Sequence, residues 1–381
     1  MSRLERVWEG RGPLSTLLLP LAGVHGALAR LDRLRRGGGG PRPAPDARAA
    51  HGLPVVVVGN LAVGGTGKTP LVAALVEAFG ACGVRCGIVS RGYGGARQLR
   101  PVPVLADESA ARVGDEPLML ARATGAPVCV CVHRDLAVEH LAARADVDLV
   151  LSDDGLQHRA MARDVEICVI DAARGLGNER LLPAGPLRET AGRLAFVDLV
   201  ALRVDATGVT ASGEGGTDEG DGSRTPGAPG PPFAARLDAL APGVARASFT
   251  VALDGAVRLG TGEAVALERW RGRRVHAVAG IARPERFFAM LRARGLDVVD
   301  HPFADHHRFS ARDVDFGDAC PVLVTSKDAV KLGALAPVPP GVIEVRSRAR
   351  LDPALHAAVR AMARRLCPER IGAPDEDPPR M

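Results

Sequence analysis

Aromatic residues are scarce in this chain of 381 residues, and phenylalanine, tyrosine and tryptophan together make up 3% of it. Lysine is scarcer still and occurs only at Lys68, Lys327 and Lys331, so the net charge of +5 rests on scattered arginines. A nucleic-acid-binding protein needs its basic residues gathered on one face, with aromatic residues for stacking. We therefore expect no nucleic-acid partner. We expect the three lysines to occupy positions where a guanidinium would not serve.

The seven cysteines form no CxxC pair. Their odd number and scatter argue against a disulfide framework or a zinc site and favour a reducing compartment. Several lie inside apolar runs, which predicts buried structural thiols. The chain also shows no metal-collecting cluster of cysteine and histidine of the kind expected in a metallochaperone.

The N-terminal segment 1–35 lacks the small-residue cleavage site of a secretory signal peptide. Leucines and a valine recur at helical spacing from Leu14 to Leu34, and arginines follow from Arg30 to Arg36. An apolar face with a basic end predicts an amphipathic helix that lies in a membrane interface. A helix packed on the protein's own core is the first alternative. A membrane span is the second, although a proline and two glycines interrupt the run.

Low-complexity segments suggest where the chain divides. Residues 36–50 are rich in glycine and proline and predict a flexible tether. Residues 206–250 predict a linker, in which the stretch 211–232 has almost no large apolar side chain and is expected to be a disordered insertion. The remaining predicted units are residues 51–205, 251–350 and 351–381.

Short apolar, β-branched runs alternate with helical patterns in residues 51–205. This alternation predicts an α/β domain with a parallel sheet covered by helices on both faces. A second, smaller α/β domain is predicted in 251–350, followed by a closing helix and a polar tail in 351–381. The expected strands begin at Val55, Gly87, Val128, Val147, Ile167 and Leu199 in the first domain, and at Val275, Val298, Val322 and Val342 in the second.

The run VVVVGNLAVGGTGKTP, residues 55–70, joins a buried strand to a glycine-rich turn and the start of a helix. In a P-loop, the backbone N–H groups of such a turn surround a phosphate, the lysine neutralises it and the hydroxyl ligates Mg²⁺. Ala62 stands at the usual first glycine, a departure that the remaining glycines can tolerate. The predicted residues for ATP and Mg²⁺ are Gly64, Gly65, Thr66, Gly67, Lys68 and Thr69.

A P-loop needs an acidic partner at the end of a neighbouring strand. The expected strand that ends at Leu151 continues as SDDGLQH. Carboxylates at that edge hold Mg²⁺ directly or through water. We predict Asp153, Asp154 and Gln157 as metal ligands together with Thr69, without choosing between the two aspartates. A cap for the next helix is the alternative role for these carboxylates.

These features predict a nucleoside triphosphate site without assigning its use. The GGTGKT core also resembles the loops of partition and septum-site ATPases and of nucleotide-driven metallochaperones. A membrane-associated P-loop switch ATPase or metallochaperone is therefore an alternative to a kinase. Val63 stands where those ATPases carry a signature lysine, which disfavours that alternative.

Further motifs point to one family when they are taken together. They are SRGYG from Ser90, GDEP from Gly114, DDGLQH from Asp153, LPAGPLRE from Leu182, AGIA from Ala279, FADHH from Phe303 and TSKDAVK from Thr325. With the P-loop and the N-terminal segment, they resemble the tetraacyldisaccharide 4'-kinases, the lipid A 4'-kinases, from about residue 14 to residue 332. This resemblance implies two α/β/α domains with the active site in the cleft between them.

The resemblance also implies a reaction and its place. The γ-phosphate of ATP would pass to the 4'-hydroxyl of a tetraacyl disaccharide 1-phosphate. The enzyme would be peripheral, at the cytoplasmic face of the bacterial inner membrane, and we expect no obligate protein partner. Asp115 and His306 would activate the hydroxyl, because a carboxylate that orients an imidazole raises its basicity. A helix cap for Asp115 and a structural role for His306 are the alternatives.

Lys68 and Asp154 would complete the catalytic set by organising the triphosphate. Arginines at the remaining matched positions suit anionic oxygens, although each is equally consistent with a solvated charge. Lys327 is expected to face phosphate in the cleft, with a structural ion pair as the alternative. The residues expected near the substrate are Asn60, Arg91, Arg134, His158, Arg188, Glu189 and Lys327.

Overall fold

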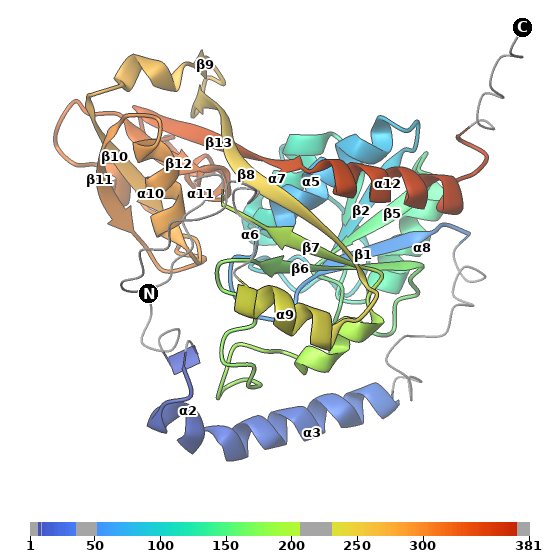
Figure 1. Ribbon diagram of the computed structural model, residues 1–381. Coiled ribbons are helices and arrows are strands. Elements are labelled where there is room, and N and C mark those ends of the chain that lie inside the picture. Colours follow the sequence, from blue (N-terminus) through green and yellow to red (C-terminus); the bar gives the residue numbers. More distant parts are fainter. Residues whose placement is uncertain (1–6, 9, 36–51, 206–230, 372–381) are drawn as a thin grey trace, which may run out of the picture.

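The computed structural model describes residues 7–8, 10–35, 52–205 and 231–371 (Figure 1). The predicted tether at 36–50 and the residues of the polar tail after 371 lie outside the described residues. Most of the predicted insertion, residues 211–230, also lies outside them.

One 13-stranded sheet runs through the molecule in the order β11-β10-β12-β13-β8-β7-β6-β1-β5-β2-β4-β3, with β9 paired to β8 (Figure 1). Neighbouring strands are parallel except in the pairs β13–β8, β8–β9 and β3–β4. The strands are β1 (Val55–Gly59), β2 (Cys86–Ser90), β3 (Val102–Pro103), β4 (Val128–Val130), β5 (Leu149–Asp153), β6 (Val165–Asp171), β7 (Leu199–Arg203), β8 (Ala245–Arg258), β9 (Ala264–Val265), β10 (Arg274–Ala279), β11 (Asp297–Pro302), β12 (Val322–Thr325) and β13 (Val342–Leu351).

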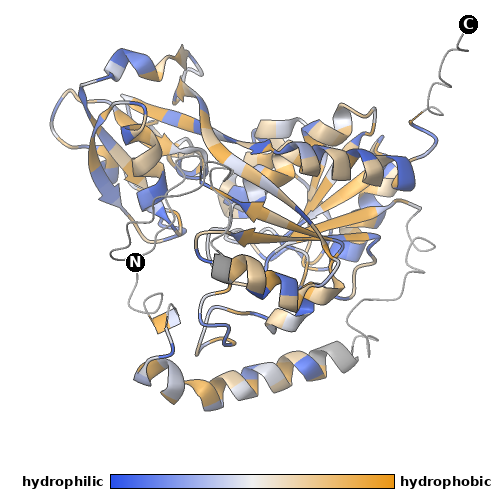
Figure 2. Cartoon of the chain, in the orientation of Figure 1, coloured by the Kyte–Doolittle hydropathy of each residue, from blue (hydrophilic) through white to orange (hydrophobic). Residues whose placement is uncertain are grey.

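Helices cover both faces of the first part of this sheet. Val56 and Val58 of β1 pack into one core, together with α5 (Lys68–Gly80), α7 (Asp115–Thr124) and α12 (Pro353–Leu366). Val55 and Val57 point to the opposite face, which is covered by α8 (Arg134–Arg144), η2 (Ala191–Phe196) and α9 (Pro231–Leu240). Because both of its faces are buried, β1 carries four valines in a row, and the strands of this part of the sheet are mostly apolar in Figure 2. The short helix α6 (Ala110–Val113) precedes α7.

The second part of the sheet has its own two cores. Val275, Ala277 and Ala279 of β10 pack on one face against α10 (Pro284–Arg292). Val278 points to the other face. That face is covered by α11 (Ser326–Leu332) and η4 (Ala311–Val314). The short helix η3 (Leu267–Trp270) packs into the core on the same face as α10. The predicted fold class, a P-loop-type parallel sheet with a second and smaller α/β part, is confirmed.

The long strands β8 and β13 pass from one part to the other. Their register shifts between Val345 and Ser347, where a β-bulge interrupts the ladder. The cores change at the same place, so we call residues 52–205, 231–252 and 347–371 the first lobe and residues 253–346 the second lobe. The predicted boundary at residue 250 falls inside β8, which is continuous across it. Sequence patterns did not predict β8, and the division into separate domains stays a prediction.

The N-terminal helices α2 (Pro13–Leu17) and α3 (Leu19–Arg35) lie along the outside of the first lobe (Figure 1). The Ser15 hydroxyl donates to the carbonyl of Ala184 at 2.6 Å, and the Asn178 amide donates to the Ser15 hydroxyl at 2.9 Å. Beyond this contact the helices expose an apolar ridge at helical spacing. The ridge consists of Leu14, Leu17, Leu21, Val24, Leu28 and Leu31, which are between 47% and 75% exposed. Within the described residues, no helix combines the length and apolarity that crossing a membrane requires.

Candidate active site

A cavity of about 1100 Å³ lies between the two lobes. The first lobe contributes the P-loop and the carboxyl ends of β2 and β5, where side chains of parallel strands converge. The second lobe contributes residues that follow β10, β11 and β12. The predicted residues that line this cavity are Gly64, Gly65, Thr66, Gly67, Lys68, Thr69, Arg91, Arg134, Asp153, Asp154, Gln157, His158, Arg188, His306 and Lys327.

The P-loop connects β1 to α5 and adopts backbone conformations that favour glycine. Gly67 is the residue before α5 and has a φ of 87°, in the left-handed region. Ala62, at the usual first glycine, forms a β-bridge with Leu187 and has no positive φ, so its Cβ is tolerated. Asn60 donates its side-chain amide to the Thr66 hydroxyl at 3.1 Å. The loop is therefore fixed by its neighbours before any nucleotide binds.

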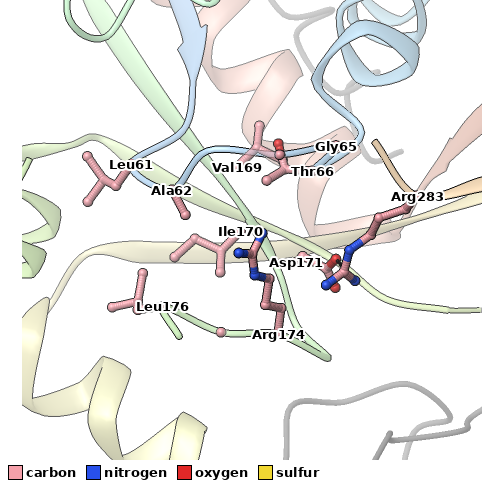
Figure 3. A pocket seen from close by; sticks show the side chains of 12 residues that line it. Leu61, Ala62, Gly65, Thr66, Val169, Ile170, Asp171, Arg174, Leu176 and Arg283 are labelled. Carbon is pink, nitrogen blue, oxygen red and sulfur yellow. Dashed lines mark hydrogen bonds and ion pairs between the residues drawn. The ribbon is translucent and has the colours of Figure 1, made fainter. Parts of the chain in front are cut away.

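A small pocket of about 10 Å³ lies beneath the P-loop (Figure 3), with room for roughly one water molecule. Arg174 reaches across it and donates to the carbonyl of Val63 at 2.9 Å. Arg283, from the second lobe, donates to the buried carboxylate of Asp171 at 3.1 Å. The pocket is too small to hold a nucleotide, and the Arg174 side chain that crosses it supports the loop from below.

Asp154 connects the P-loop lysine to the sheet. Its Oδ1 lies 3.5 Å from the Lys68 Nζ, and its carboxylate accepts two bonds from Arg188 at 2.9 and 3.0 Å. Burial works against ionisation, but the charges of Lys68 and Arg188 outweigh it and hold the pKa of Asp154 at about 2. Its φ is 50°, an uncommon value for a residue other than glycine. The carboxylate is therefore charged and fixed at the cavity wall.

Asp153 is the last residue of β5 and is almost completely buried. Burial, with the nearby charges of Glu116 and Asp154, raises its pKa to about 7. Its Oδ1 is enclosed and has no hydrogen-bond partner in the described part of the chain. A buried carboxylate oxygen without a partner, beside a second carboxylate and the Thr69 hydroxyl, fits a divalent cation with oxygen ligands.

Arg134 and His158 form the wall next to these carboxylates. Arg134 is 4% exposed, and its Nη1 donates to the Asp154 carbonyl at 2.9 Å. Burial lowers the pKa of Arg134 to about 10, so it keeps its charge at neutral pH. Burial, followed by the charge of Arg134, lowers the pKa of His158 to about 4, so its ring is neutral. Its Nε2 lies 3.3 Å from the Val132 carbonyl.

Two predicted substrate contacts lie behind the cavity wall. Asn60 contacts Thr66, and its carbonyl accepts a bond from the Gln157 amide at 3.1 Å. Glu189 accepts a bond from the same amide at 3.4 Å and from Arg159 at 2.5 Å. Neither residue lines the cavity. Both position Gln157, which does.

Asp115 and His306 meet across the two lobes. Asp115 is the first residue of α7, is 4% exposed, and lies behind the cavity wall. His306 follows β11 in the second lobe and has a φ of 60°. Its Nδ1 lies 3.2 Å from the Asp115 Oδ2. Burial alone raises the pKa of Asp115, but the bond to His306 and the charges of Lys327 and Lys331 lower it below its usual value.

Lys327 is surrounded by carboxylates and lines the same cavity. Its Nζ lies 3.2 Å from Glu116, 3.1 Å from Asp305 and 3.3 Å from the Nε2 of His306. Burial opposes its charge, but the carboxylates outweigh burial and raise the pKa of Lys327. Lys331 lies 3.5 Å from the Asp115 Oδ2. The two lysines thus hold the acidic end of α7 to α11.

Comparisons with known proteins agree on one family. Residues 14–364 match the family described as tetraacyldisaccharide-1-P 4'-kinase. A tetraacyldisaccharide 4'-kinase of Azoarcus sp. strain BH72 is 48% identical over 332 residues, which cover 87% of each chain. One from Alkalilimnicola ehrlichii is 44% identical over 368 residues, covering 96% of this chain and 98% of the relative.

The chain belongs to the tetraacyldisaccharide-1-P 4'-kinase family. A crystal structure of LpxK from Aquifex aeolicus in complex with ATP has the same fold, with a TM-score of 0.67. It is 23% identical and covers 93% of this chain and 99% of its own. These similarities do not favour the switch ATPase or metallochaperone alternative.

A group of arginines at the cavity of this kinase was not among the predicted residues. Arg203, Arg283 and Arg286 line it, and Arg286 pairs with the buried Asp171 at 2.8 Å. Arg286 and Arg283, which directly precedes α10, therefore join this part of the second lobe to β6 of the first. Arginine is so frequent in the sequence that these positions carried no signal.

Proposed function

We propose that the protein transfers the γ-phosphate of ATP to the 4'-hydroxyl of a tetraacyl disaccharide 1-phosphate, a step of lipid A biosynthesis. One observation carries this proposal. Lys68 of the P-loop and His306, which Asp115 holds from behind the cavity wall, face one cavity from opposite lobes, so a phosphate donor and a hydroxyl acceptor can meet there. Membership of the 4'-kinase family supports the same reaction and the same acceptor.

The phosphate donor is held by the first lobe. Backbone N–H groups of the P-loop and the ammonium of Lys68 bind the triphosphate, and Arg188 adds charge at the developing transition state. Asp153, Asp154, Thr69 and Gln157 would hold Mg²⁺, which when bound neutralises charge on the phosphate oxygens. Because Arg188 already pairs with Asp154 at 2.9 Å, it is oriented before the substrate arrives.

The acceptor hydroxyl is activated by the second lobe. The Nδ1–H of His306 donates to Asp115, and the lone pair on its Nε2 accepts the hydroxyl proton. Lys327 lies 3.3 Å from that Nε2, and its ammonium supplies positive charge to the incoming phosphate oxygens. His306 thus acts as the base, and Asp115 orients it.

The experiment that tests the reaction uses ATP labelled at the γ-phosphate and the tetraacyl disaccharide 1-phosphate in mixed micelles. The native protein should label the lipid at its 4' position. Lys68→Ala should abolish transfer because the phosphates lose their main counter-charge. ATP hydrolysis by the native protein with no label on the lipid would rule out the kinase and favour a switch ATPase.

We also propose that the enzyme binds peripherally to the cytoplasmic face of the bacterial inner membrane, where four acyl chains hold the acceptor. The apolar ridge of α2 and α3 supports this proposal, because Leu21 and Leu28 are 57% and 62% exposed. Burying each of them in a bilayer interface stabilises the bound state by about 1 kcal/mol at that exposure.

Replacing both leucines by serine tests the membrane proposal. The expected result is roughly 30-fold weaker binding to anionic vesicles, with a higher apparent KM for the lipid and unchanged ATP binding. Leu99 and Leu105 are matched controls, because they are 56% and 61% exposed and do not belong to α2 or α3. Equal losses in the ridge variant and the control variant would contradict the proposal.

A further inference from the structure

A cluster of metal-binding side chains lies in the second lobe and does not line the active-site cavity. His276 is on β10, and Asp318 and Cys320 precede β12. One ligand atom from each of the three lies within 4.8 Å of the others. Within the described ranges, no other group of three or more His, Cys, Asp and Glu side chains is this close. Sequence patterns did not indicate this group, because 42 residues of sequence separate His276 from Asp318.

The orientation of His276 is fixed on several sides. Its side chain is 9% exposed, and its Nε2 lies 3.1 Å from the Asp318 Oδ2. Its Nδ1 lies 2.9 Å from the Nε2 of His301, on the neighbouring strand β11. Phe316 stacks on both rings, with centroid distances of 4.1 Å to His276 and 4.0 Å to His301. Metal-ligating histidines are held in this way, by a hydrogen bond at the second ring nitrogen.

We propose that His276, Asp318 and Cys320 bind Zn²⁺ through Nε2, a carboxylate oxygen and Sγ, with water as the fourth ligand. A tetrahedral Zn²⁺ with bonds of about 2.0–2.3 Å keeps its ligand atoms about 3.3–3.7 Å apart. The 3.1 Å between imidazole and carboxylate is close to this spacing. The Sγ of Cys320, a half-buried free thiol, lies within 4.8 Å of both of these atoms.

The ligand set distinguishes this site from the predicted Mg²⁺ site. A thiolate and an imidazole select Zn²⁺ over Mg²⁺ or Ca²⁺, which prefer oxygen ligands only. On binding, the thiol proton leaves to solvent and Sγ coordinates as thiolate. The proton of His276 then sits on Nδ1 and is donated to the His301 Nε2. The ion ties the segment before β12 to β10, so its effect is on the stability of the second lobe.

Co²⁺ is a suitable probe, because a cobalt thiolate absorbs in the near ultraviolet and tetrahedral Co²⁺ in the visible range. The full-length protein without nucleotide, in excess Mg²⁺ to occupy oxygen-only sites, should bind one Co²⁺ with both bands. Added Zn²⁺ should remove the bands. Cys320→Ser should lose the thiolate band, and Cys82→Ser should keep it, since Cys82 is also a half-buried free thiol.

His301→Gln tests the outer partner of His276 and should weaken Co²⁺ binding roughly 10–100-fold while the thiolate band persists. Zn²⁺ should also raise the Tm of the native protein and of Cys82→Ser but not that of Cys320→Ser. Absence of the thiolate band in the native protein would overturn the proposal, as would its persistence in Cys320→Ser. Both outcomes are independent of phosphate transfer and leave the proposed kinase activity untouched.

Discussion

The contact between Asp115 and His306 predicts a large loss of rate when either residue is neutralised. The two groups lie 3.2 Å apart, and Asp115 is 4% exposed. At an effective dielectric constant of about 20, a carboxylate stabilises an imidazolium at this distance by about 5 kcal/mol. The His306 side chain is 26% exposed, so solvent screening reduces this to about 3–5 kcal/mol. Asp115→Asn should therefore lower kcat about 10²–10⁴-fold.

The assay is label transfer to the lipid under saturating ATP, with Asp115→Asn, His306→Gln and the double variant measured side by side. Because the pair acts as a unit, the kcat of the double variant should be at most a few-fold lower than that of the slower single variant. The Kd for ATP should stay near its native value, since neither residue belongs to the P-loop. Fully additive losses in kcat would refute the reasoning, and so would a loss below tenfold in Asp115→Asn.

Two further predictions concern stability. Asp153 has a folded-state pKa of about 7, above its unfolded value, so folding binds a proton and native stability falls as pH rises through this range. In Mg²⁺-free buffer, the unfolding free energy of Asp153→Asn minus that of the native protein should therefore increase by about 2 kcal/mol from pH 5 to pH 7.5. A difference that stays constant with pH would contradict this prediction. Glu166 is 2% exposed and pairs with Arg163 at 3.0 Å and with Arg193 at 2.5 Å. Glu166→Gln should lower the free energy of unfolding in urea by about 3 kcal/mol. The control Glu263→Gln, at an exposed ion pair, should lower it by less than about 0.5 kcal/mol. Equal losses in the two variants would contradict the prediction.

Local sequence patterns predicted those elements whose surroundings are uniform. β1 is buried on both faces, so its valines form an unbroken apolar run. The closing helix predicted within 351–381 is α12 (Pro353–Leu366), which begins there because Asp352 caps it and a proline opens it. β8 was missed because its 14 residues alternate irregularly between buried and exposed positions as it crosses the lobes. No single period describes such a strand.

The candidate site was predictable where a motif is contiguous and unpredictable where it is assembled by folding. Lys68 and Asp154 follow from the P-loop and from a strand end. The partnership of Asp115 with His306 spans 191 residues, and only family resemblance distinguished His306 from His307. The cluster at His276 had no such guide. Its side chains come together because β10 lies beside β11 and β12, and a parallel register is not visible in residue spacing.

The contact between His306 and Asp115 joins the two lobes, which has a consequence for ATP that is bound without an acceptor. Asp115 belongs to the lobe with the P-loop, whereas His306 belongs to the other, and the paired strands β8 and β13, whose register shifts between Val345 and Ser347, link the two. Any bending of these strands which widens the entrance for a lipid also separates imidazole from carboxylate. In a molecule opened in that way, ATP bound to the first lobe would lack the base that we propose. On the proposed mechanism, transfer would therefore require the two lobes to stay as close as the 3.2 Å contact between the imidazole and the carboxylate places them.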